Sequence, residues 1–233
     1  MPQPITQPSI ELRTLLSGYS ALTVRDRLHL SVRYLVCPLH KIAAHVPDEG
    51  VIVDVGCGHG LFAQILGRLG PKRRVLGFDL DAHKIGLAAQ LSAAGSGFAN
   101  LEFQVADAAQ AQVPPAQAVT ILDVLYLVPY AAQEKLLADC AAKLAPGGVL
   151  LLKEIAERPR WKFWANWLEE SLMVRVLRLT AGRGGFYFRT RAQWQQLLAG
   201  LGLEVATVDL DRGYYHAHVL FVGRKKAAAR EKQ

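Results

Sequence analysis

The ten residues Val51–Gly60, VIVDVGCGHG, constrain the fold of this chain more than any other stretch. The first five are β-branched and apolar apart from Asp54, a pattern typical of a short strand buried on both faces. Three alternating glycines follow, and a helical apolar pattern resumes at Leu61. Glycine permits a sharp turn and close approach of a ligand, and the first N–H groups of a helix are unpaired. The stretch therefore predicts a strand, a glycine turn and a helix that bind a polar or anionic ligand.

Beyond this turn, segments with strand character alternate with helical ones, which is the pattern of a doubly wound parallel sheet. Strands are expected at 51–55, 74–79, 101–107, 118–123, 149–153, 203–210 and 217–222, with a basic turn at 70–73 before the second and a glycine turn at 145–148 before the fifth. Helices are expected at 82–94, 131–144 and 191–201. The predicted fold class is α/β, a doubly wound, seven-stranded, mostly parallel sheet with an antiparallel last strand.

The helical segments outside this alternation suggest how the chain is organised. Residues 9–46 have apolar positions at helical spacing and predict two or three helices. The predicted parts are an N-terminal helical cap (1–49), a ligand-binding core (50–155), a helical lid between strands five and six (156–195), C-terminal strands that complete the sheet (196–223) and a basic tail (224–233). Within the lid, 161–180 is a long stretch rich in Trp and Leu, and a helix packed on the core is the alternative interpretation.

Composition narrows the class of protein. Hydrophobic residues make up 51% of the 233 residues and charged residues 20%, as in a globular chain. Three cysteines without a CxxC spacing favour reduced thiols in a cytoplasmic protein and argue against a disulfide framework or a zinc site. The first ten residues lack the pattern of a signal peptide, and no apolar stretch predicts a membrane span.

The formal net charge of +7 is concentrated in two late segments. Residues 158–191 carry a net +6 and residues 224–233 a net +4, whereas residues 50–157 carry −2. Such a patch attracts anions, which include nucleic acid, acidic lipid head groups and phosphate-bearing substrates. Because no RNA-binding module is recognisable and the cations alternate with Trp and Leu, nucleic acid is not expected as a partner.

Acidic residues mark the ends of the predicted strands. Asp54 lies within the first strand, and the second, third and fourth end at Asp79, Asp107 and Asp123. In an open α/β sheet the ligand lies at the carboxyl ends of the strands, where the strand order reverses. Asp79 follows Gly56 by 23 positions, the distance at which a carboxylate can accept both hydroxyls of a ribose. Helix capping explains any one of these residues but not four in register with a glycine turn.

This set, with the spacing Asp-x-Gly-x-Gly-x-Gly, resembles the class I S-adenosylmethionine-dependent methyltransferases over about residues 50–155. A dinucleotide-binding fingerprint would instead need a glycine where Leu61 stands. The resemblance implies S-adenosylmethionine as the cofactor. The binding residues that it implies are Asp54, Val55, Gly56, Cys57, Gly58 and Gly60 around the methionine part, Asp79 and Leu80 at ribose and adenine, Asp107 and Ala108 at the adenine edge, and Asp123 beside the sulfonium.

Methyl transfer from a sulfonium is an in-line displacement, and a general base is needed only if the acceptor must lose a proton. The catalytic candidates are Asp123, Tyr126 and Glu154. Tyr19 is a candidate to close over the cofactor, and His59 is expected to face solvent or bond to backbone. The sequence after strand four is not the Asn/Asp-Pro-Pro-Tyr/Phe of enzymes that methylate exocyclic or amide nitrogens. His216 and His218 alternate on one strand, but no metal site is expected.

The acceptor is expected to be a small, apolar molecule that is lipid-like, aromatic or bound to a carrier protein, and the transfer an O- or C-methylation. Trp161, Trp164 and Trp167 would line an apolar lid with a basic rim, which suits such an acceptor and leaves open a peripheral contact with a membrane. Two alternatives remain. One is an RNA methyltransferase that uses the basic segment, and the other is a non-catalytic protein that keeps the fold for binding.

Overall fold

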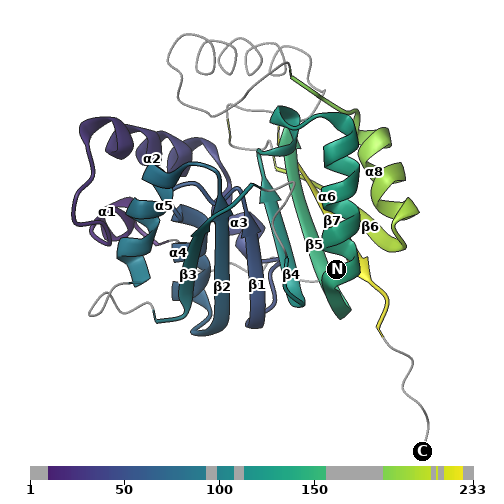
Figure 1. Cartoon of the computed structure of the whole chain (residues 1–233), viewed down its shortest axis with the longest axis horizontal. Helices are drawn as coiled ribbons and strands as arrows, with labels where there is room; N and C mark the ends of the chain where they lie inside the picture. Colours follow the sequence, from purple (N-terminus) through teal and green to yellow (C-terminus); the bar gives the residue numbers. More distant parts are fainter. Residues whose placement is uncertain are drawn as a thin grey trace, which may run out of the picture.

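The computed structural model describes residues 10–92, 99–107, 113–155, 186–210, 214 and 218–227. Seven strands form one sheet in the order β3-β2-β1-β4-β5-β7-β6 (Figure 1). Their bounds are β1 Glu49–Val55, β2 Lys72–Asp79, β3 Leu101–Val105, β4 Ala116–Leu122, β5 Leu144–Ile155, β6 Leu203–Asp209 and β7 His218–Lys225. The strands from β3 to β5 pair in parallel, whereas β7 is antiparallel to both β5 and β6. The predicted fold class, including the antiparallel last strand, is confirmed.

Helices cover both faces of the sheet (Figure 1). The described α-helices are α1 Leu12–Leu16, α2 Val24–Val36, α3 Leu39–Ala43, α4 Leu61–Leu69, α5 Ala82–Ala89, α6 Tyr130–Lys143 and α8 Arg191–Gly200, and the 3₁₀ helices are η1 Gln90–Ser92 and η2 Leu125–Leu127. Because side chains alternate along a strand, each strand contributes to two cores. On β1, Ile52 packs in the core that includes α3 and α4, and Val53 packs in the core that includes α6 and α8.

The N-terminal part forms three short helices, in agreement with the expectation of two or three. Thr23 and Asp26 form a capping box that starts α2. Helix α2 ends at Val36, just before Pro38, which has no N–H to continue the helix. Val24, Leu28 and Leu35 remain on the exposed side of α2. No helix among the described residues is long and apolar enough to cross a membrane.

The element boundaries differ from the predictions at several places. Strands β3 and β4 end at Val105 and Leu122, before Asp107 and Asp123, and the helix expected at 82–94 is α5 followed by η1, which ends at Ser92. The expected basic turn at 70–73 is wrong in its second half, because β2 begins at Lys72 and Arg73 lies inside the strand. The Arg73 side chain is buried, and its guanidinium donates to the carbonyls of Val46, Pro47 and Leu66. Carbonyls of the loop before β1 and of the last turn of α4 therefore hold a charge that the sequence pattern assigned to solvent.

Strand β5 begins at Leu144, so the expected glycine turn at 145–148 is an irregularity within that strand, with Gly147 at φ +77°. At the other end of the chain, β7 continues to Lys225, two residues into the predicted basic tail. The Lys225 ammonium donates to the carbonyls of Ala141, Ala142 and Leu144, which fixes the strand end against α6. Trp161–Thr180, including Trp164 and Trp167, lies outside the described residues.

Candidate functional site

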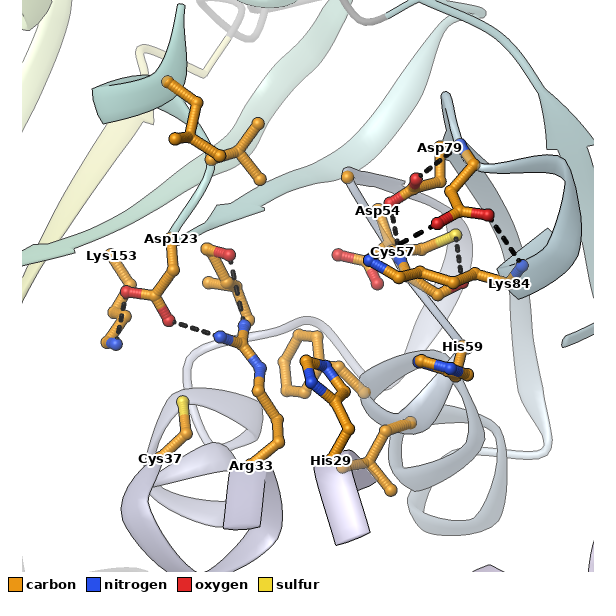
Figure 2. A pocket seen from close by; sticks show the side chains of 18 of the residues that line it. His29, Arg33, Cys37, Asp54, Cys57, His59, Asp79, Lys84, Asp123 and Lys153 are labelled. Carbon is orange, nitrogen blue, oxygen red and sulfur yellow. Dashed lines mark hydrogen bonds and ion pairs between the residues drawn. The ribbon is translucent and has the colours of Figure 1, made fainter. Parts of the chain in front are cut away.

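A cavity of about 430 Å³ opens at the carboxyl ends of β1, β2 and β4, between these strand ends and α2. This volume falls within the range of about 300–1,000 Å³ that is usual for small-molecule sites. The cavity lies where the strand order reverses between β1 and β4, the position expected for a ligand in an open α/β sheet. Figure 2 shows Cys57, Asp79 and Lys84 at one side of it and Arg33, Asp123 and Lys153 at the other.

The glycine turn is held against the end of β2 by backbone hydrogen bonds. The N–H groups of Gly56 and Cys57 donate to the Phe78 carbonyl at 2.7 and 3.0 Å. Gly56, Gly58 and Gly60 all have positive φ, at +74°, +55° and +77°. A Cβ on Gly60 would lie 2.8 Å from the Phe103 ring, whereas a Cβ on Gly58 would meet no atom within 4 Å. Packing therefore requires glycine at 60, and at 58 the missing side chain leaves space in the cavity lining.

Asp79 orients its carboxylate into the same region. Its Oδ2 accepts from the Gly58 N–H at 2.8 Å and its Oδ1 from the Asp81 N–H at 2.9 Å. Each carboxylate oxygen retains a second lone pair, so two further donors can bind there. Leu80 and Asp107 also line the cavity, and Ala108 lies outside the described residues.

Asp54 is buried at the floor of the cavity, with 2% of its surface exposed. Thr120 Oγ1 donates to its Oδ1 at 2.6 Å. Burial raises the pKa of Asp54 to about 7, because the charged form is poorly solvated there. The side chain of Val55 packs in the hydrophobic core, and neither Val55 nor Gly60 is part of the cavity lining.

Asp123 joins two cations that come from different elements. Its Oδ1 accepts from Lys153 Nζ at 2.5 Å and its Oδ2 from Arg33 Nη1 at 2.7 Å. Arg33 Nη2 also donates to the Leu122 carbonyl at 3.1 Å. Burial opposes ionisation of Asp123, but the charges of Lys153 and Arg33 outweigh it and hold its pKa well below the ordinary range. Asp123 is therefore a stable anion and a weak base.

Of the other two catalytic candidates, one lines the cavity and the other does not. Tyr126 lines the cavity, is almost fully buried, and stacks on Phe188 with ring centroids 5.6 Å apart. Glu154 is adjacent to Lys153 on β5 and so points to the opposite face. Its Oε1 accepts from the Leu125 N–H at 3.2 Å, and the residue is not part of the cavity lining. The structure thus brings Asp123 and Tyr126 to the cavity and places Glu154 at the start of η2, outside the cavity lining.

The expectation for His59 is wrong. His59 is buried, and its Nε2 lies 3.2 Å from Oδ1 of Asp26, so it neither faces solvent nor bonds through its ring to backbone. His83 Nε2 lies 3.2 Å from the other oxygen of the same carboxylate. Tyr19 donates its hydroxyl to the His59 carbonyl at 2.8 Å and so holds the glycine turn from outside the cavity lining.

Sequence reasoning missed the residues that reach the cavity from distant elements. These are Arg33 and His29 from α2, and Lys153 from β5. Burial, and then the charges of His59, Lys84 and Arg33, lower the pKa of His29 to about 4. The alternation of side chains along β5 could have indicated that Lys153 is buried, because it lies on the same strand face as the core residue Leu151. No comparable pattern marks Arg33, which lies on a helix. His218, considered above for a metal, lines the cavity with its Nε2 3.0 Å from the Val36 carbonyl, and His216 lies outside the described residues.

The comparisons with known proteins give the family. A family model described as "Methyltransferase domain" matches residues 28–208. A ubiquinone biosynthesis O-methyltransferase from Burkholderia thailandensis is 35% identical over 106 residues, which is 45% of this chain and 44% of that protein. A trans-aconitate 2-methyltransferase from Paracidovorax citrulli is 34% identical over 122 residues, which is 50% of this chain and 44% of that protein. The chain thus matches somewhat less than half the length of these curated relatives.

Solved structures share the fold at low sequence identity. An O-methyltransferase family protein from Burkholderia thailandensis has a TM-score of 0.68 at 18% identity, covering 88% of this chain and 60% of that one. Human N-acetylserotonin methyltransferase in complex with SAM has a TM-score of 0.65 at 18% identity, covering 92% of this chain and 56% of that one. Because the family model spans most of the sequence and the sheet has the matching topology, the chain belongs to the methyltransferase-domain family, and its resemblance to the class I S-adenosylmethionine-dependent methyltransferases is confirmed.

Proposed function

We propose that this chain transfers a methyl group from S-adenosylmethionine to an oxygen of a small acceptor bound under α2. The observation that carries the proposal is the division of the cavity into two ends. One end has the glycine turn, Asp54 and Asp79. The other is mostly apolar, with Val32, Val36 and Leu39 beside the Asp123 cluster, which consists of Asp123, Arg33 and Lys153.

The residues at the first end fit the cofactor. The free space beside Gly58 and the two oxygens of Asp79, each with a lone pair to spare, suit a ribose with two hydroxyl groups. Asp54, buried close to the turn, suits the amino group of the methionine part. When bound, the cofactor supplies an electrophilic methyl group on a sulfonium.

The remaining residues would position the acceptor and exclude water. Tyr126, within η2, forms part of the cavity wall, and the Tyr187 N–H donates to its carbonyl at 2.8 Å, so the segment 186–190 holds this wall in place. Glu154 would act as a positioning residue that holds the start of η2 through the Leu125 N–H. O-methylation is favoured over C-methylation by the names of the relatives reported above. A carrier-bound acceptor and a membrane contact through 161–180 stay predictions.

Calorimetric titration with S-adenosylmethionine and S-adenosylhomocysteine, on protein stripped of bound ligand, tests the proposal. We expect both to bind, and Asp79→Ala to weaken binding by about 1–3 kcal/mol through loss of charge-assisted hydrogen bonds. Asp139→Ala is the matched control, because Asp139 is an exposed carboxylate that pairs with Lys135 on α6. Absence of binding by the unaltered protein, or equal affinities for Asp79→Ala and the control, would contradict the assignment.

A further inference from the structure

Lys153 is a buried cation that faces a cavity with apolar walls. Its side chain is 1% exposed, and it lies on β5 with its ammonium 2.5 Å from Oδ1 of Asp123. Within the described residues, that contact is the one hydrogen bond of its three N–H groups. Burying an ammonium without enough acceptors is costly, so the remaining donors favour an acceptor atom supplied by a ligand.

Arg33 places a second cation on the same carboxylate. It approaches Asp123 from α2, and the described acceptors of its guanidinium are Asp123 and the Leu122 carbonyl. A guanidinium has five N–H donors, so donors remain for a further acceptor. One anion thus faces two cations at this end of the cavity.

Neighbouring acids do not remove this excess of positive charge. Glu154 points to the opposite face of the sheet, where it accepts from the Leu125 N–H. Asp54 on β1 attracts Arg33 through space but is hydrogen-bonded to Thr120, and its pKa, raised to about 7 by burial, leaves a large part of it neutral at pH 7. The walls beside Lys153 include Cys37, Leu39 and Ile155, which carry no compensating anion. An anionic oxygen of a ligand would complete the set of charges.

The position of the pair separates it from the cofactor end. Lys153 is level with Leu122 in the sheet, and β5 is two strands from β1, a lateral distance of roughly 10 Å. In Figure 2 the Asp123 cluster lies across the cavity from Asp79 and Cys57. A ligand group bound between Lys153 and Arg33 is therefore expected to belong to the acceptor rather than to the cofactor.

We infer that the acceptor carries an anionic oxygen, as a carboxylate or an ionised acidic hydroxyl, and that Lys153 and Arg33 bind it. The identification of the anion as the methyl acceptor rests on the proposed function, whereas the presence of an anion site does not. Lys153 and Arg33 are then specificity-determining residues, which select an acid over its neutral analogue because only the acid supplies the missing charge.

Matched small probes test this inference. Binding of benzoate, benzamide and 4-nitrophenol (ionised at pH 8) would be measured by calorimetry, with S-adenosylhomocysteine present and absent. Benzoate and benzamide have nearly the same shape and differ in charge, and the nitrophenol separates an ionised hydroxyl from a carboxylate. We expect at least one anion to bind about tenfold or more tightly than benzamide.

Substitutions of Lys153 and Arg33 test whether these two cations cause the preference for an anion over benzamide. Lys153→Met and Arg33→Met should each abolish it, Lys153→Arg should retain it, and Lys143→Met, on the exposed end of α6, should leave it unchanged. Asp123→Asn should strengthen anion binding, because it removes the competing carboxylate, and asparagine tolerates the φ of +60° found there. A variant that only damaged the fold would also weaken S-adenosylhomocysteine binding, which serves as the internal check.

Two outcomes would overturn the inference. Equal affinity of the unaltered protein for benzoate, 4-nitrophenol and benzamide would show that no anion site exists. Loss of S-adenosylmethionine affinity in Lys153→Met, with rescue by Lys153→Arg, would assign the cations to the cofactor instead. Anion binding that persists where S-adenosylhomocysteine fails to bind would support the anion site while contradicting the proposed function, so the two failures can be told apart.

Discussion

At the scale of single residues, Asp54 and Asp123 show how position decides the chemistry of one side chain. Both lie near the carboxyl ends of adjacent strands and both line the cavity. Asp54 is buried with a hydroxyl donor and has its pKa raised to about 7, whereas two cations hold the pKa of Asp123 low. At neutral pH, Asp54 can therefore exchange a proton when its surroundings change, and Asp123 cannot.

If Asp54 binds the amino group of the cofactor as proposed, its raised pKa predicts that cofactor binding is linked to a proton. A cationic amino group placed beside Asp54 stabilises its ionised form, so the pKa falls and the carboxyl loses its proton. At pH 6, below the free pKa of about 7, binding of S-adenosylmethionine should release close to one proton. Calorimetry in buffers with different ionisation enthalpies measures this release. Asp54→Asn should abolish it, and the same release in that variant would mean that another group is responsible.

At the scale of elements, the glycine turn between β1 and α4 combines two requirements that its sequence does not distinguish. Gly58 and Gly60 both adopt positive φ, which costs an ordinary residue about 1 kcal/mol or more. They differ in their surroundings, since a Cβ would approach Phe103 and Ala88 at position 60 and no protein atom at position 58. Packing therefore requires glycine at position 60, whereas at position 58 the missing side chain leaves space that we propose the ligand fills.

This difference predicts opposite phenotypes for two alanine variants. Gly60→Ala should lower the free energy of unfolding more than Gly58→Ala, by about 1–3 kcal/mol, because overpacking adds to the backbone strain. Gly58→Ala should stay more stable yet bind S-adenosylhomocysteine more weakly, since its methyl group occupies cavity space. Urea unfolding and calorimetry measure the two quantities. Equal stability of both variants would show that the turn relaxes around position 60.

At the scale of the whole molecule, polar contacts tie the N-terminal helices to the sheet and so form one wall of the cavity. Asp26 joins α2 to the glycine turn through His59 and to α5 through His83. Arg33 joins the same helix to Asp123. The exposed Val24, Leu28 and Leu35 show that apolar packing covers only part of α2. These charged contacts therefore help to set where α2 lies over the cavity.

Replacement of Asp26 measures how much its contacts with His59 and His83 contribute to the free energy of unfolding. Burial opposes ionisation of Asp26, but hydrogen bonds from Thr23, His59 and His83 outweigh it and hold its pKa below the ordinary value. A lowered folded-state pKa gives stability that is full above the unfolded pKa of about 3.9 and is lost as pH falls below it. Asp26→Asn should thus cost about 1–3 kcal/mol at pH 7.

Urea unfolding at pH 7, 5 and 3 tests the sign of this effect. The difference between the unaltered protein and Asp26→Asn should shrink between pH 5 and pH 3, while the control Asp139→Asn should change little throughout. A difference that stays constant down to pH 3 would mean that the charge of Asp26 contributes nothing to folding.

The fold and the cofactor end of the site could be predicted because their signals are local. Alternation of strands and helices has fixed periods, and the glycine turn with acids at strand ends can be found by spacing along the chain. Asp54, Gly56, Gly58, Asp79 and Asp123 accordingly all line the cavity. Errors arose where long-range burial overrides local preference, as for Arg73, whose guanidinium is held by carbonyls of the loop before β1 and of α4.

The arrangement of charged residues at the proposed acceptor end of the cavity depends on tertiary structure. Asp123 meets Arg33 from 90 positions away and Lys153 from 30, and His59 meets Asp26 from 33. No periodicity links such positions, because their proximity depends on how α2 packs on the sheet and on which strand lies beside β4. The sequence by itself therefore determined the sheet, the glycine turn and the position of the Asp79 carboxylate beside it. Packing alone decided which cations surround Asp123, because the energy of a charge pair depends on distance and burial in space.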